Sequence, residues 1–208
     1  LQLVSVYAGM KVIHESRPQE AVALMEKVQP TFMVVVPRIL EKIRAAARAT
    51  ARSKKLGGAF SLAETTAIAW GEYLEKTQKD PSLKPSWPLA IRHATCDRLF
   101  YCRIRTLMGG KIDYLLSGAS PLDAELGNFF RGAGIPVLEG YGLTEASPVC
   151  SVNFVDPAPS NAAGDFIPGM KKGTVGALLP GIAVRITSPH TGRVVPVTTS
   201  GMIWLKGP

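Results

Sequence analysis

A seven-residue run in the second half of the chain concentrates groups that could bind a nucleotide, and it reads Glu139-Gly140-Tyr141-Gly142-Leu143-Thr144-Glu145. The glycines allow the backbone to turn sharply and to approach a ligand closely. Tyr141 offers a flat ring face to a base, and Thr144 can donate a hydrogen bond to a phosphate oxygen. Glu145 can hold a hard cation such as Mg²⁺. The run therefore indicates a nucleotide site.

A second run with small residues, Ser117-Gly118-Ala119-Ser120, precedes the first by about twenty positions. Each run follows an apolar segment that predicts a buried strand, first Ile112–Leu116 and then Ile135–Leu138. A predicted helix separates the two strands, which indicates a βαβ unit with parallel strands. Ligands of such sheets bind beyond the carboxyl ends of the strands. If the two strands are neighbours, both runs face one crevice; the alternative is that both are merely tight turns.

The helix of this βαβ unit has a clear apolar face, formed by Leu122, Leu126, Phe129, Phe130 and Ala133. We predict that Ser120 caps its beginning, with Pro121 at the first helical position and Asp123 as the acid of a capping box.

Upstream of this unit, apolar runs alternate with helical spacing. Extended segments are predicted at Leu3–Tyr7 and Lys11–Ile13, and a strand buried on both faces at Phe32–Val36. Helices are predicted at 18–28, from Pro37 to Lys55, at 61–77 and at 92–108. The pattern indicates an α/β fold, a parallel sheet with covering helices.

After Pro148 the pattern changes to short apolar segments divided by glycine and proline. Loops are predicted at 156–160 and 167–169, and short strands at 174–175, 182–187, 194–197 and 202–206. We therefore predict two parts, an α/β subdomain at 1–147 that carries the nucleotide-site loops and a small β-rich subdomain at 148–208. Leu1 is not an initiator Met, and both ends resemble strands, so we interpret the sequence as an excerpt of a longer chain.

The net charge of +8 is concentrated in the helix that begins at Pro37. Helical spacing places Arg44, Arg48, Arg52 and Lys55 in one narrow arc, which we call the basic stripe. A solvated helix face is the simplest interpretation; binding to an acidic membrane surface or to ligand phosphates is the alternative. Nucleic acid is not expected as a partner, because the stripe lacks aromatic residues that would stack on bases.

Several other classes of protein are excluded or disfavoured. No apolar run approaches the length of about 20 residues that a membrane-spanning helix needs. Three cysteines, without metal-type spacing, favour a reduced cytoplasmic protein over a disulfide scaffold. The residues match no Walker phosphate loop, dinucleotide-binding glycine motif, zinc-protease motif or nucleophile elbow. His14, His93 and His190 are scattered, and we interpret each as a surface residue.

The two runs together resemble the adenylate-forming enzymes, which include acyl-CoA synthetases, luciferases and peptide-synthetase adenylation domains. The matching residues are Ser117 to Leu122 followed by Gly140 to Glu145, in the right order and at the right distance. The resemblance extends over nearly the whole chain, through Pro30-Thr31, residues 37–42, Gly173 to Gly176 and Leu179-Pro180-Gly181. Asp97 to Phe100 and Gly109-Gly110-Lys111 are most similar to the long-chain fatty acid CoA ligase branch.

This resemblance implies an acid-thiol ligase that uses ATP, Mg²⁺ and coenzyme A. A fatty acid would be activated as an acyl-adenylate and then transferred to the thiol of coenzyme A, with release of AMP. Thr144 and Glu145 would be the catalytic residues, with Thr144 on the α-phosphate and Glu145 on the metal. Tyr141 would stack on adenine. The other cofactor-binding residues would be Gly118, Ala119 and Ser120 in the adenosine pocket, Glu139, Gly140 and Gly142 between nucleotide and acyl chain, and Leu143.

The resemblance also implies parts that these residues do not contain. The lysine-bearing phosphate loop belongs before Leu1, and the ribose-binding aspartate and catalytic lysine belong after Pro208. We therefore expect residues 1–208 alone to be inactive and to bind ATP weakly. Two alternatives stay open: an adenylating enzyme for an aromatic or amino acid, and a non-catalytic membrane- or protein-binding domain. We expect a cytoplasmic protein with peripheral contact to acidic membrane as an option.

Overall fold

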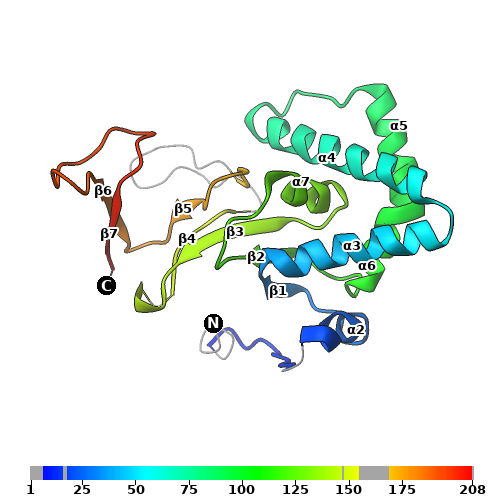
Figure 1. Ribbon diagram of the computed structural model, residues 1–208, viewed down its shortest axis with the longest axis horizontal. Coiled ribbons are helices and arrows are strands. Elements are labelled where there is room, and N and C mark those ends of the chain that lie inside the picture. The colour runs from blue at the N-terminus through cyan, green and yellow to red at the C-terminus, as the bar shows by residue number, and fades with distance from the viewer. Residues whose placement is uncertain (1–6, 16–17, 147, 155–168, 208) are drawn as a thin grey trace.

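The computed structural model describes residues 7–15, 18–146, 148–154 and 169–207. Five strands form one sheet in the order β1-β2-β3-β4-β5, and two further strands, β6 and β7, form a separate small sheet. Helices gather over the first sheet, with α7 between α4 and the strands, and α2 lies beyond β1 (Figure 1). The predicted α/β class, with a small second sheet, is confirmed.

The helical elements are α2 (Pro18–Val28), α3 (Pro37–Ser53), α4 (Gly57–Lys79), α5 (Trp87–Cys96), the π-helical turn η1 (Asp97–Tyr101), α6 (Cys102–Leu107), α7 (Ala124–Gly132) and the 3₁₀ turn η2 (Thr144–Ala146). The strands are β1 (Phe32–Val35), β2 (Tyr114–Ser117), β3 (Val137–Gly142), β4 (Val149–Val152), β5 (Ala177–Leu178), β6 (Ala183–Thr187) and β7 (Met202–Lys206). The predicted helices are confirmed. The helix predicted at 92–108 forms as three successive helical segments, α5, η1 and α6.

Several predicted extended segments are wrong or fall outside the described residues. Residues 11–13 form no strand, and neither do 174–175. Val194 makes only an isolated bridge with Thr187, so 194–197 is not a strand. Residues 3–6 and the loop predictions at 156–160 and 167–168 lie outside the described residues. Short β-branched runs fail here because strand formation needs a pairing partner that local sequence does not specify.

Strands β1, β2 and β3 pair in parallel, with Phe32 opposite Tyr114 and Leu115 opposite Val137. The predicted βαβ unit, β2-α7-β3, is therefore confirmed. The prediction that the first strand is buried on both faces is wrong, because Val34 is 45% exposed. The strand order places β1 at one end of the sheet, where one face has less cover.

The sheet changes direction after β3, because β4 pairs antiparallel to β3 and β5 antiparallel to β4. The first strands after Pro148 thus continue the sheet of the α/β part. β6 and β7 pair separately, from Ala183 opposite Lys206 to Thr187 opposite Met202. The division at 147 and 148 stays a prediction.

The helices α4 and α7 pack closely through glycines. A Cβ atom on Gly71 would lie 2.4 Å from the carbonyl oxygen of Asn128, and one on Gly132 would lie 1.9 Å from that of Ala67. Only glycine permits backbones to approach this closely. All five residues of the predicted apolar face of α7 are buried, which confirms that prediction.

The start of α7 differs from the prediction. Asp123, not Ser120, caps the helix: its backbone is extended and its side chain accepts a 2.9 Å hydrogen bond from the Leu126 amide. The three preceding residues remain in the loop because the amide of Leu122 is bound elsewhere, by the Glu139 carboxylate.

The histidines and cysteines of the chain were also located in the structure. His93 is half-buried and not a surface residue, because its ring stacks on Trp70 at 4.0 Å and its Nε2 lies 2.7 Å from the Gly132 carbonyl oxygen. His14 and His190 are exposed, as predicted. The three cysteines are free thiols. Among the described residues, no helix is both long and apolar enough to cross a membrane.

The basic stripe is not a continuous solvated face. Glu64 of α4 is only 5% exposed and binds two members of the stripe, accepting from Arg44 Nε at 2.8 Å and from Arg48 Nη2 at 2.7 Å. The Arg44 guanidinium also lies 5.3 Å from the centre of the Phe129 ring. Arg44 and Arg48 therefore join α3 to α4. Membrane contact stays a prediction that depends on Arg52 and Lys55.

Removal of both arginines is expected to destabilise the fold. In an Arg44→Ala/Arg48→Ala variant of the full-length protein, the Glu64 carboxylate remains buried without its partners, so the free energy of unfolding should fall by about 2 to 3 kcal/mol. The matched control, Arg52→Ala, changes an exposed arginine of the same helix and should alter it by less than about 0.5 kcal/mol. Chemical denaturation measures both. Equal stability of the two variants would contradict a structural role for the pair.

Candidate functional site

The two nucleotide-site runs lie side by side in the structure. β2 and β3 are neighbours, with Ser117 opposite Glu139 in parallel register. A Cβ atom on Gly118 would lie 3.6 Å from the carbonyl oxygen of Gly140, so the two backbones are almost in contact. The predicted convergence of the runs at one edge of the sheet is confirmed.

The first run forms a tight loop after β2. Gly118 donates its backbone N–H to the Val35 carbonyl at 3.3 Å, so the loop starts anchored to β1. Ala119 then adopts φ +68°, a left-handed conformation that costs a residue with a Cβ atom about 1 kcal/mol. Ala119 and Ser120 are exposed. The loop therefore presents small, accessible groups at the carboxyl end of the strand.

The glycines of the second run predicted a loop from Gly140 onward. In the structure, the first half of the run belongs to strand β3, which ends at Gly142. β3 continues to Gly142 because Gly140 pairs with Val152 and Tyr141 with Ser151 of β4. The register shifts between Tyr141 and Gly142, so the strand bulges there. Bulges redirect side chains and are frequent beside binding sites.

Gly140 and Gly142 allow neighbouring segments of the chain to lie close to the backbone of β3. A Cβ atom on Gly142 would lie 1.8 Å from the Pro148 carbonyl oxygen. One on Gly140 would lie 3.3 Å from Leu116 Cδ1 and 3.3 Å from the Ser151 carbonyl oxygen. Glycine at 142 is therefore required for the chain to fold back into β4.

Beyond the bulge the chemical groups of the run are accessible. Leu143, Thr144 and Glu145 are exposed, and Tyr141 is half-buried. The 3₁₀ turn η2 is closed by a 2.9 Å hydrogen bond from the Ala146 amide to the Leu143 carbonyl. Thr144 and Glu145 thus project from a short ordered turn at the end of β3.

Glu145 offers one exposed carboxylate to a cation. No group of three or more metal-ligating side chains occurs in the part of the chain that the structure describes. Mg²⁺ commonly takes one or two carboxylates and completes its coordination with phosphate oxygens and water. A single exposed carboxylate suits this arrangement.

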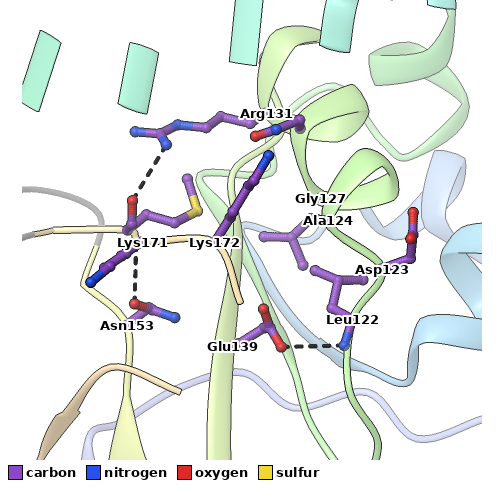
Figure 2. Close-up of a pocket in the computed structure, with 12 residues that line it drawn as sticks. Leu122, Asp123, Ala124, Gly127, Arg131, Glu139, Asn153, Lys171 and Lys172 are labelled. Atoms are coloured by element: carbon purple, nitrogen blue, oxygen red, sulfur yellow. Dashed lines mark hydrogen bonds between the residues drawn. The ribbon is translucent and has the colours of Figure 1, made fainter. Parts of the chain in front are cut away.

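A small pocket with polar and apolar residues in its wall lies beside β3, and Glu139 points into it (Figure 2). Its volume of ≈ 20 Å³ has room for little more than water. Around the pocket, Arg131 donates to the Met170 carbonyl at 3.4 Å and the Lys171 amide donates to Asn153 Oδ1 at 3.3 Å. The pocket therefore links α7, β3 and β4 with the segment that leads into β5.

Burial raises the pKa of the Glu139 carboxyl above its ordinary value, and the hydrogen bond from the Leu122 amide only partly offsets this. Burial also lowers the pKa of the Arg131 guanidinium, and only 9% of the surface of this residue is exposed. Sequence reasoning missed the residues around the pocket, because they come from separate elements and share no spacing: Arg131, Asn153, Lys171 and Lys172.

A family model described as AMP-binding enzyme matches residues 1–208. The long-chain-fatty-acid–CoA ligase FadD15 of Mycobacterium bovis is 31% identical over 186 residues, which cover 89% of this chain and 28% of the ligase. Long-chain-fatty-acid–CoA ligase 1 of Cavia porcellus is 26% identical over 185 residues, 88% of this chain and 23% of that protein.

A solved structure is similar in fold: O-succinylbenzoate coenzyme A synthetase (MenE) from Bacillus subtilis, in complex with ATP and magnesium ion. The TM-score is 0.52 at 17% identity, over 99% of this chain and 29% of that one. The chain thus spans between about a quarter and a third of the length of these proteins.

Substitution of Gly142 tests the close approach at the bulge. Gly142→Ala places a methyl group into the Pro148 carbonyl, so the free energy of unfolding of the full-length protein should fall by about 3 kcal/mol. Gly118→Ala is the matched control, since its added Cβ meets only ordinary van der Waals contact, and it should cost less than about 1 kcal/mol. Thermal or chemical unfolding compares them; equal losses would contradict the assigned role of Gly142.

The raised pKa of Glu139 predicts a pH dependence of stability. A carboxyl that binds its proton more tightly in the folded chain makes the fold less stable as pH rises through the raised pKa. Glu139→Gln removes this loss, so the variant should gain stability relative to wild type at neutral pH. The gain should shrink as pH falls toward the ordinary pKa of glutamate. Unfolding curves from about pH 4 to about pH 8 measure it; a gain that grows toward acid pH would contradict the sign.

Proposed function

The chain belongs to the family of AMP-binding enzymes, and from this premise we propose that the protein is an ATP-dependent long-chain fatty acid CoA ligase. The observation that carries the proposal is the convergence of the two runs: Gly118 lies against Gly140, and the Thr144-Glu145 pair lies in the turn η2 that follows the same strand. This arrangement supplies small backbone groups, an aromatic ring, a hydroxyl and a carboxylate at one edge of the sheet.

The proposed reaction has two steps. A carboxylate oxygen of the fatty acid attacks the α-phosphorus of ATP, and the bond to pyrophosphate breaks. The sulfur of coenzyme A then attacks the acyl carbonyl carbon, and AMP leaves. The first step needs neutralised phosphate charge and in-line positioning more than it needs a protein nucleophile. The absence of a nucleophile elbow from the sequence is compatible with this chemistry.

The proposed roles follow the geometry of β3 and its neighbours. Tyr141, half-buried beside the bulge, stacks on adenine, and residues 118–120 line the adenosine pocket with backbone and small side chains. Thr144 donates its hydroxyl to the α-phosphate. Glu145 is the ligand of Mg²⁺, which when bound neutralises phosphate charge. Gly140, Gly142 and Leu143 shape the wall between nucleotide and acyl chain.

The names of the two ligases described above favour a fatty acid over an aromatic or amino acid as the substrate. Coenzyme A is the proposed acceptor on the same ground. The three free thiols support a reducing compartment, and we propose the cytoplasm. Residues 1–208 alone are expected to form no acyl-CoA, because the resemblance places the phosphate-loop lysine and the catalytic lysine outside them.

The Thr144-Glu145 pair provides the test. In the full-length protein, Thr144→Ala and Glu145→Ala should each lower the rate of acyl-adenylate formation about 100-fold or more, because each removes a group that acts on the transferring phosphate or its metal. Pyrophosphate release with palmitate, ATP and Mg²⁺ measures this step without coenzyme A.

Glu125→Ala is the matched control, since Glu125 is an exposed carboxylate in the first turn of α7. It should leave the rate within about 2-fold. If the two site variants fold normally and keep full adenylation activity, the site assignment is wrong.

A further inference from the structure

Glu139 contacts both ends of the loop that carries Gly118, Ala119 and Ser120. Its backbone pairs with Ser117, the last residue of β2, at the beginning of the loop. Its carboxylate Oε2 accepts a 3.2 Å hydrogen bond from the backbone amide of Leu122, where the loop ends, and this bond is the dashed line between them in Figure 2. One residue of β3 thereby holds residues 118–121 from both sides.

The far end of the loop lies before the first turn of α7. Ser120 does not cap α7, because Asp123 caps it, so the helix begins only after Leu122. Ala119 holds a left-handed conformation that the free backbone disfavours. The Leu122 side chain is buried while residues 119–121 are exposed. The bond from Leu122 to Glu139 is thus placed where the loop returns to the core.

The charged groups that line the pocket with Glu139 have other contacts. Arg131 donates to the carbonyls of Met170 and Leu74, each at 3.4 Å, and Lys172 Nζ lies 3.7 Å from a Glu72 carboxylate oxygen. The Lys171 side chain and Asp123 are exposed. Among the described residues, the Glu139 side chain accepts its hydrogen bond from the Leu122 amide. A carboxylate that accepts from a backbone N–H makes a comparatively strong, charge-assisted bond.

Glu139 also shares a strand with Tyr141, two positions further on. Alternate residues of a strand point to the same face, so the two side chains are set by one stretch of backbone. A shift of the loop relative to β3 would therefore change the distance between the small groups at 118–120 and the Tyr141 ring.

We infer that Glu139 is a positioning residue, which holds the loop at 118–121 against β3 and so sets the affinity for the nucleotide and not the rate of the chemical step. The inference rests on the proposed function, because it assumes that a nucleotide occupies the space between loop and Tyr141. It assigns Glu139 a contact with Leu122 in place of one with the ligand.

Three variants of the full-length protein test this inference. Glu139→Met keeps the length and apolar stem of the side chain but removes the hydrogen-bond acceptor. Glu139→Gln keeps an acceptor oxygen and removes the charge. Glu125→Gln, at the exposed carboxylate of α7, is the control. The measurements are the KM for ATP and kcat of adenylation, the Kd for ATP by calorimetry, and hydrogen exchange of the Leu122 amide.

Glu139→Met should raise the KM and Kd for ATP about 10-fold, as expected for the loss of one such hydrogen bond, with kcat within about 2-fold. Its Leu122 amide should exchange faster with solvent than in wild type. Glu139→Gln should restore slow exchange and an ATP affinity within about 2-fold of wild type, and the control should match wild type throughout.

Three outcomes would overturn the inference: unchanged ATP affinity and Leu122 exchange in Glu139→Met, equal damage in Glu139→Gln and Glu139→Met, or a fall in kcat with KM unchanged. Failure of the proposed function is distinguishable, since wild type would then show no adenylation and no ATP binding. In that case the exchange of the Leu122 amide still decides whether Glu139 holds the loop.

Discussion

The double pairing of β3 is the constraint on which the rest of this structure depends. On one side β3 runs parallel to β2, and on the other it runs antiparallel to β4. Residues 137–139 of β3 pair with β2 and residues 140–142 pair with β4, and at the change-over Gly142 lies where an added Cβ atom would be 1.8 Å from the Pro148 carbonyl oxygen. The parallel ladder brings the loop after β2 beside β3, and the antiparallel ladder turns the chain at the bulge so that Thr144 and Glu145 project from the edge. The site is a consequence of where one ladder ends and the other begins.

Local patterns predicted the elements whose stability is local. The helix at 18–28 has its full apolar spacing within eleven residues and a terminating Gln29-Pro30, and its bounds were predicted correctly. The end of β3 was predicted too early because its last residues are held by β4, a partner that local sequence does not reveal. The cap of α7 was misassigned for a similar reason. Ser120 and Asp123 are both good caps in isolation, and the bond between Leu122 and Glu139, seventeen positions apart, decides between them.

The candidate site shows the same division. The convergence of the two runs could be predicted because βαβ connections have a regular handedness and their carboxyl ends share an edge. The pocket behind them could not be predicted, since Arg131, Asn153 and Lys172 come from separate segments and no residue spacing joins them. The basic stripe was a correct periodicity with an incomplete interpretation. Helical spacing gives the direction of Arg44 and Arg48 on α3, but only the packing of α4 places Glu64 in front of them.

Three glutamates illustrate how surroundings decide what a carboxylate does. Glu64 is buried, and its charge is tolerated because two guanidinium groups replace the lost water. Glu139 is half-buried with one backbone N–H as its partner, so burial still raises its pKa and its main effect is to hold a neighbouring segment. Glu145 is exposed on a short turn, where water solvates its charge. Only the last of these settings leaves carboxylate oxygens accessible to a metal that enters with a nucleotide. Exposure in the turn after the carboxyl end of β3 is the property that separates Glu145, the proposed ligand of Mg²⁺, from the other two.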